Sequence, residues 1–418
     1  MRLVNQVGKA LARTAGVTAA LGMVWGFSAP STPQTLGMAA DAIVVKLASS
    51  SAKIIQDSKW GPIGHLQAAI NSHASSCGIA PVTLDGHYGK TTAVAARAIA
   101  LCQGADSVSD DLTAGAWQAV TGDAAPNAVE RARTLARTLE STDYDQLEWN
   151  ICVAYKGDGA SVLTWGPYGK TLGWGGELMT VLKKIDPRVV KATFESSGAK
   201  GVDQLLALKS AKQLHASPKQ AYPGARLLMT KICKQPGQME AWRTAFAKLG
   251  AMPDVQKTYE DVAWGDDGWF RYVVERLETS WRNAGLEPTE VDFAFFLDRS
   301  IHMGWGDARF AAVDAALANL KNCVAPEAFT NARARLAVSD AVRAKAHPED
   351  RIARDAMFLV DSEDKLADAM AQSNWPKNWK ALWAKRSGIS ASDVGLSDDR
   401  PAAGFGDRPA VTQTAANN

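Results

Sequence analysis

Two acidic residues lie where a helical pattern gives way to a Gly-rich segment, and such a pair can carry acid–base chemistry. Glu140 closes an amphipathic segment, and Asp158 follows it between two glycines; Glu148, between them, is a rival candidate. Hydrolysis of a glycosidic bond needs two carboxylates, one protonated to assist the leaving group and one ionised to activate water or to attack the sugar. Glu140 and Asp158, held on two walls of a cleft, would supply such a pair.

Most of the chain predicts helices, with one short sheet in the region of the candidate acids. Apolar residues recur at three- and four-residue steps in five segments, which predicts amphipathic helices at 128–140, 176–185, 268–284, 291–303 and 307–320. Residues 152–175 are rich in Gly, Thr, Tyr and Trp with short apolar alternation, which predicts a small antiparallel sheet with tight turns. We therefore expect an α+β fold that is mostly helical.

Changes in composition divide the chain into parts. Residues 28–35 hold two prolines among small polar residues and predict a linker, and residues 122–127 mark the next break. We place a small domain at 55–122 and a large domain at 128–396. Because Pro and Gly are frequent after residue 396, we expect a flexible tail at 397–418.

The small domain carries a recognisable order of short motifs. Leu66-Gln67 lies in a helical segment, the turn Asp85-Gly86-x-x-Gly89 follows, and the helical segment 93–103 comes next. This order resembles the helical peptidoglycan-binding domain family, and the likeness implies a three-helix module that binds the glycan strands of peptidoglycan. Cys102 stands where that family usually has an aromatic residue. A three-helix bundle without wall affinity is the alternative.

The large domain resembles the inverting chitosanases of the lysozyme superfamily. The likeness rests on the helix-end Glu140, an Asp158-Gly159 pair eighteen residues later, a nearby Thr164, and a Gly-rich turn that ends in Glu177. It implies a lysozyme-like domain in which Glu140 is the general acid and Asp158 the general base. By the same likeness, Thr164 orients the attacking water and Glu177 binds substrate. Thr164 lies one residue farther from Asp158 than in the family, so Ser161 is the alternative water ligand.

The resemblance also implies a structural ion pair. The segment 292–304 matches the buried helix of the chitosanases, and the segment 351–358 resembles a later helix whose Arg reaches back to it. An ion pair between Asp298 and Arg351 would then be buried, and each charge would need the other.

Tryptophan is unusually frequent, with 14 Trp against seven Tyr. Most of these rings are expected in the core, but indole and phenol rings also offer flat apolar surfaces for sugars. Trp165 and Tyr168, next to Thr164, are our candidate rings for substrate binding.

Composition argues against several other functions. The 46 basic and 44 acidic residues nearly balance, which leaves no dense positive surface for nucleic acid. The six His and five Cys residues form no HExxH or CxxC pattern, so we expect no metal and no cofactor. Cys77 and Cys102 could form a disulfide or stay as buried thiols, and Cys152 is expected on a strand facing the core.

The amino-terminal segment predicts export. Three basic residues precede a weakly apolar run at 16–27, a layout typical of a signal peptide or of a weak membrane anchor within residues 1–40. An uncleaved amphipathic helix is the alternative. We expect no other contact with a membrane, a monomer, and a location in the periplasm or at the cell wall. The alternative location is that of a phage protein that acts at the wall of its host.

These observations lead to one functional hypothesis with two rivals. The expected function is a peptidoglycan hydrolase that cuts the β-1,4 bonds of the glycan by two-carboxylate catalysis. The chitosanase likeness favours chitosan as an alternative substrate, but the module at the front favours peptidoglycan, because fold alone does not fix substrate. The non-enzymatic rival is a wall-binding structural protein of a virion or a secretion apparatus.

Overall fold

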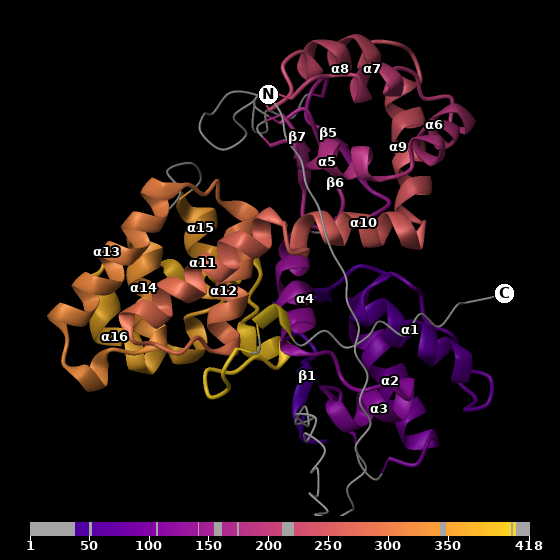
Figure 1. Ribbon diagram of the computed structural model, residues 1–418. Helices are drawn as coiled ribbons and strands as arrows, with labels where there is room; N and C mark the ends of the chain where they lie inside the picture. The colour runs from indigo at the N-terminus through magenta and orange to yellow at the C-terminus, as the bar shows by residue number, and fades with distance from the viewer. Residues whose placement is uncertain are drawn as a thin grey trace, which may run out of the picture. The chain divides into compact units, whose positions relative to one another are not determined.

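The computed structural model describes residues 38–49, 52–105, 108–140, 142–153, 161–173, 175–210, 221–342, 348–402 and 404–406. The predicted signal peptide or anchor therefore lies almost wholly outside the described residues. From Met38 on, the chain forms one compact unit. It is mostly helical with small antiparallel sheets, as the α+β prediction expects (Figure 1).

The front part combines three helices with two short sheets. Its elements are β1 (Ile43–Val45), β2 (Ile55–Gln56), α1 (Pro62–His73), β3 (His87–Tyr88), α2 (Lys90–Cys102), β4 (Leu112–Thr113) and α3 (Ala114–Thr121). β1 pairs with β4 and β2 pairs with β3, both antiparallel. Because β1 completes the sheet of β4, the front part begins before residue 55, where the sequence placed its start.

One buried amide organises the turn that the sequence singled out. The side-chain oxygen of Gln67 accepts hydrogen bonds from the backbone N–H groups of Asp85 and Gly86, at 3.0 and 2.8 Å. Its amide nitrogen donates to Asp85 Oδ1 at 2.7 Å. Gly86 has φ +73°, and a Cβ there would lie 2.3 Å from the carbonyl oxygen of Asp57, so only glycine fits. The Leu-Gln and Asp-Gly motifs therefore describe one connected structure.

The large part begins with a helix and a three-stranded sheet. The first elements are α4 (Ala128–Glu140), β5 (Leu147–Trp149), β6 (Leu163–Trp165), β7 (Lys170–Leu172), α5 (Glu177–Lys184), α6 (Pro187–Ser196), α7 (Val202–Leu206), α8 (Ala225–Cys233), α9 (Gln238–Gly250) and α10 (Pro253–Trp264). The strands lie in the order β5-β6-β7, and both pairs are antiparallel. The predicted helix 128–140 is confirmed, and β6 and β7 lie in the predicted sheet region, but β5 comes before residue 152, where the sequence placed the start of the sheet.

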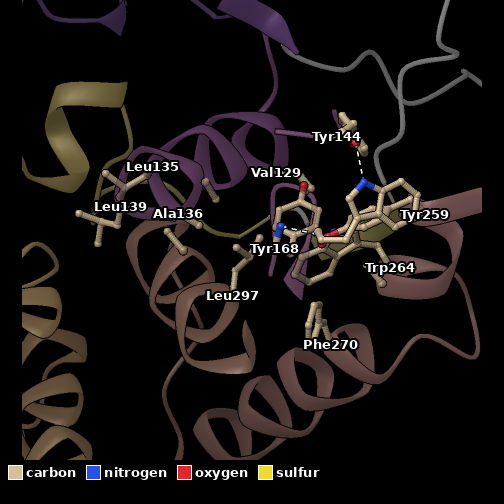
Figure 2. Packing of buried hydrophobic residues seen from close by; sticks show 14 of the residues in the cluster. Val129, Leu135, Ala136, Leu139, Tyr144, Tyr168, Tyr259, Trp264, Phe270 and Leu297 are labelled. Carbon is tan, nitrogen blue, oxygen red and sulfur yellow. Dashed lines mark hydrogen bonds between the residues drawn. The ribbon is translucent and has the colours of Figure 1, made fainter. Parts of the chain in front are cut away.

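The chain then continues as helices. These are α11 (Trp269–Ala284), α12 (Glu290–His302), α13 (Asp307–Cys323), α14 (Asn331–Ala341), α15 (Pro348–Ala356), α16 (Glu363–Gln372) and α17 (Trp379–Arg386), with short 3-10 turns at η1 (Pro326–Ala328), η2 (Val360–Ser362), η3 (Ala391–Val394) and η4 (Gly404–Gly406). α12 is buried along nearly its whole length, and the charges of its buried Asp292, Asp298 and Arg299 are compensated by ion pairs. It packs against α4, and Figure 2 shows Leu297 of α12 beside Ala136 of α4. The central helix pair is therefore α4 and α12.

Two disulfides are present. Cys77 bonds to Cys102, which joins the turn after α1 to the end of α2, and Cys152 bonds to Cys233. The prediction that Cys152 faces the core from a strand is wrong: it lies exposed in a bend just after β5, with φ +61°. Cys323 is a free, exposed thiol.

The prediction of a flexible tail from residue 397 is wrong for its first residues. Asp398 accepts hydrogen bonds from both Nη atoms of buried Arg335, at 2.8 and 2.7 Å. Arg400 donates to Glu290 at 2.6 Å, and Pro401 forms a β-bridge with Thr289. Residues 397–402 are fixed because they neutralise charges at the start of α12 and on α14.

Candidate active site

The sheet β5-β6-β7 has one polar face. The register aligns Glu148 with Thr164 and Thr164 with Thr171, so these three side chains form one row across the strands. Their strand neighbours, which point to the opposite face, are buried. The alternation therefore turns a row of one carboxylate and two hydroxyls away from the core.

Further polar groups adjoin this row. Asn150 donates to Thr164 Oγ1 at 2.7 Å, and Thr171 Oγ1 contacts Glu177 Oε2 at 3.4 Å. A Cβ on Gly169 would lie 3.4 Å from Thr164 Cγ2 and 4.0 Å from Glu140 Oε2. The last turn of α4 thus brings Glu140 to the same face, next to the β6–β7 turn.

Glu140 has two positively charged or potentially charged partners. Arg354 Nη1 of α15 donates to Glu140 Oε1 at 2.9 Å. His302 Nε2, at the end of α12, lies 3.0 Å from the same oxygen but forms no hydrogen bond with it. The Glu140 side chain is 21% exposed, so a group approaching from outside can reach it.

Behind Glu140 lies a buried network of ion pairs. Arg354 Nη2 donates to Asp298 Oδ1 at 2.6 Å, and Arg351 Nη2 donates to Asp298 Oδ2 at 2.5 Å. Arg351 also reaches Asp355 at 2.7 Å, and Asp355 in turn accepts from Arg299 at 2.7 Å. The ion pair expected between Asp298 and Arg351 is thus present, but it is one link of a larger network.

The charges set the protonation of Glu140. Burial raises its pKa, but the charges of His302 and Arg354 outweigh burial and hold the pKa below its ordinary value. Burial lowers the pKa of His302 to about 4, so the imidazole is neutral at neutral pH. At that pH the positive partner of Glu140 is Arg354. A general acid must carry a proton, so the lowered pKa of Glu140 argues against the role that the resemblance implies for it.

Glu148 shows the opposite shift. Burial and the nearby charge of Glu140 raise the pKa of Glu148. Two carboxylates whose environments move their pKa values apart are the usual arrangement for one acid and one base.

The structure separates the candidate residues into three groups. Glu140, Thr164 and Glu177 come together with Glu148 at the polar face. Asp158 lies outside the described residues, and the alternative water ligand Ser161 is buried.

The prediction that Trp165 and Tyr168 bind substrate is wrong. Trp165 is 0% and Tyr168 1% exposed. Trp165 Nε1 donates to the carbonyl of Tyr144 at 2.6 Å, and Figure 2 shows Tyr168 among Tyr259, Trp264 and other core residues. Strand alternation places Trp165 on the covered face, opposite Thr164, which leaves no ring surface for a sugar.

Three residues of the site were not predicted from the sequence: Asn150, His302 and Arg354. His302 follows Asp298 by four residues, and Arg354 follows Arg351 by three, so each shares a helix face with a member of the predicted ion pair. This helical spacing from the predicted ion pair could have identified His302 and Arg354 as neighbours of the site.

Other kinds of site are not evident in the described part of the chain. No group of three or more His, Cys, Asp or Glu side chains there is arranged to hold a metal ion. None of the helices described is both long enough and apolar enough to cross a bilayer. Two surface hollows lie along α9, and neither includes Glu140. We favour the polar face over these hollows because it gathers acids with shifted pKa values.

Comparisons with known proteins returned no match. No protein-family model matches the chain, and no curated protein and no solved structure matches it.

Proposed function

We propose that the protein is a glycoside hydrolase that cuts β-1,4 bonds in the glycan strands of peptidoglycan. The observation that supports this most is the meeting of Glu140, from α4, with the row of Glu148 and Thr164 on the sheet. Carboxylates and a hydroxyl from two separate elements are what acid–base hydrolysis with a positioned water requires. The general base in this proposal is Asp158, a role that rests on the sequence resemblance alone.

The choice of peptidoglycan rests on the front part. Its Gln67-centred turn agrees with the motif that resembles peptidoglycan-binding domains. The two disulfides support an exported protein, because such bonds persist in oxidising compartments.

The acid and base roles have two assignments. The sequence favours Glu140 as acid and Asp158 as base. The directions of the pKa shifts favour Glu148 as acid and Glu140 as ionised base. Substrates with a good leaving group distinguish them, because such substrates need no protonation: a variant without the acid keeps activity on an aryl glycoside, and a variant without the base does not.

The central experiment is digestion of purified sacculi. Wild-type protein should release soluble fragments with new reducing ends, and Glu140→Gln should release none although the variant remains folded. Chitosan is digested in parallel. Release from chitosan alone would make the protein a chitosanase, and no release from either polymer by the wild type would reject the hydrolase.

A non-catalytic wall-binding protein is the second candidate. The ion pair between Glu140 and Arg354 favours it, because a purely structural carboxylate would also be held ionised in this way. Binding of the wild type to sacculi without any release of fragments would support this candidate.

A further inference from the structure

A short segment of the front part runs along the helix that carries Glu140. Lys53 N–H donates to the carbonyl of Ser387, just beyond α17, at 2.6 Å. Farther along, the backbone N–H of Gln56 donates to Thr138 Oγ1 at 3.1 Å. We refer to residues 52–57 as the strap. It lies against α4 within the last two turns before Glu140.

Asp57 is the most buried contact of the strap. Its side chain is 0% exposed and accepts from Arg137 Nη1 at 2.6 Å and from Thr134 Oγ1 at 3.0 Å. Its backbone N–H donates to the carbonyl of Gly86 at 2.8 Å. Asp57 therefore links the Asp85-Gly86 turn of the front part directly to α4.

Thr138 makes the second contact with α4, two residues before Glu140. Its hydroxyl accepts from Gln56 N–H, and its one proton is shared between the carbonyls of Gln56 and Thr134, both at 2.9 Å. Because α4 is one continuous helix, contacts at residues 134, 137 and 138 fix the position of its last turn.

We propose that Asp57 and Thr138 are positioning residues for Glu140: through them the front part holds the carboxylate against Arg354. The front part is then a component of the site and not only a wall anchor. Whether this position serves catalysis rests on the proposed function, but the positioning itself does not.

The proposal has a consequence for the ionisation of Glu140. The ionisable groups that face it are His302 and Asp298 from α12, Arg354 from α15, Glu148 from β5 and Lys53 from the strap. Since Arg354 lies at only 2.9 Å, a small shift of the last turn lengthens this contact, while burial remains. Loosening the strap should therefore raise the pKa of Glu140.

The test compares two isosteric changes in the full chain. Thr138→Val keeps the shape of the side chain but removes its hydroxyl contacts with the strap. Thr193→Val makes the same change at a buried position on α6, a helix that packs against α9, α5 and α7. The readout is the titration of Glu140, followed by NMR of ¹³C-carboxyl-labelled glutamate and assigned with Glu140→Gln.

We expect an upward shift of the Glu140 pKa in Thr138→Val and a wild-type value in Thr193→Val. Asp57→Asn should shift it in the same direction, and if that variant does not fold, Thr138→Val still decides. A wild-type titration in Thr138→Val would overturn the proposal. Because the titration requires no catalytic turnover, it tests the positioning of Glu140 even if the sacculus assay shows that the protein is not a hydrolase. If the hydrolase holds, the limb of the pH–activity profile that depends on Glu140 should move upward as well.

Discussion

Arg354 joins Glu140 to Asp298: one guanidinium donates to Glu140 Oε1 at 2.9 Å and to Asp298 Oδ1 at 2.6 Å. A partly exposed acid at the polar face therefore shares its cation with a fully buried acid in the core. The chemistry of the face and the stability of the core depend on the same charge.

Glu140→Gln should abolish hydrolysis of sacculi. Loss of a group that transfers a proton in the transition state typically costs about 10²–10⁴-fold in rate. Release of reducing ends from sacculi measures the effect. Glu195→Gln, which changes an exposed acid on α6, should behave as wild type. Full activity of Glu140→Gln would remove Glu140 from the mechanism and leave Glu148 as the candidate acid.

Asp298→Ala should destabilise the protein strongly. It leaves the buried cations Arg351 and Arg354 without their shared partner, and such a loss typically costs about 3–5 kcal/mol. The control, Asp368→Ala, breaks a pair whose acid is 61% exposed and should leave unfolding nearly unchanged, because water and salt screen an exposed pair. Guanidinium unfolding measures both. Equal unfolding midpoints for the two variants would show that the network contributes little.

His302 should make the protein less stable in mild acid. Its pKa is lowered from 6.5 to about 4 in the folded chain, so between these values the unfolded chain binds a proton that the folded chain does not. Stability therefore falls as the pH drops from 6.5 to 4, by at most about 3 kcal/mol. In His302→Gln this part of the pH dependence should disappear from unfolding curves measured across that range. If wild type and variant show the same slope, His302 does not titrate in this way.

Asp298 acts at lower pH and by the opposite kind of shift. Its pKa is held far below the ordinary value, against the effect of burial, by Arg354 and Arg351. Its contribution to stability is fully present above the ordinary pKa of about 4 and is lost as the pH falls below that value. Asp298→Asn should therefore be less stable than wild type at pH 7, and the difference should shrink toward pH 2.

Alkylation of the native, unreduced protein should modify one thiol, Cys323. After reduction and unfolding all five cysteines should react, because the other four form two disulfides. Cys102→Ser should lower the free energy of unfolding by about 2–4 kcal/mol, whereas Cys323→Ser should leave it unchanged. Peptide mass spectrometry identifies the modified residues. Modification of Cys77 or Cys152 without reductant would contradict the pairing.

The sequence by itself determined the local elements. The helix 128–140 and the strands β6 and β7 were predicted in the right segments, because a repeat of 3.6 or two residues is visible among neighbours in the chain. The strand β5 lies outside the segment predicted for the sheet. The ion pair of Asp298 and Arg351 was also available from the sequence, through a resemblance. These features depend on short motifs and on regular spacing.

Only the tertiary structure decided which face of each element is covered and which charges meet. The sequence placed both Thr164 and Trp165 in the site, and the structure shows that Trp165 lies on the opposite, fully buried face of the strand. The ionised state of Glu140 comes from Arg354, 214 residues away, and the strap that fixes its helix comes from a part that the sequence read as a separate domain. Electrostatic and packing energies depend on distance in space, which spacing along a chain does not encode.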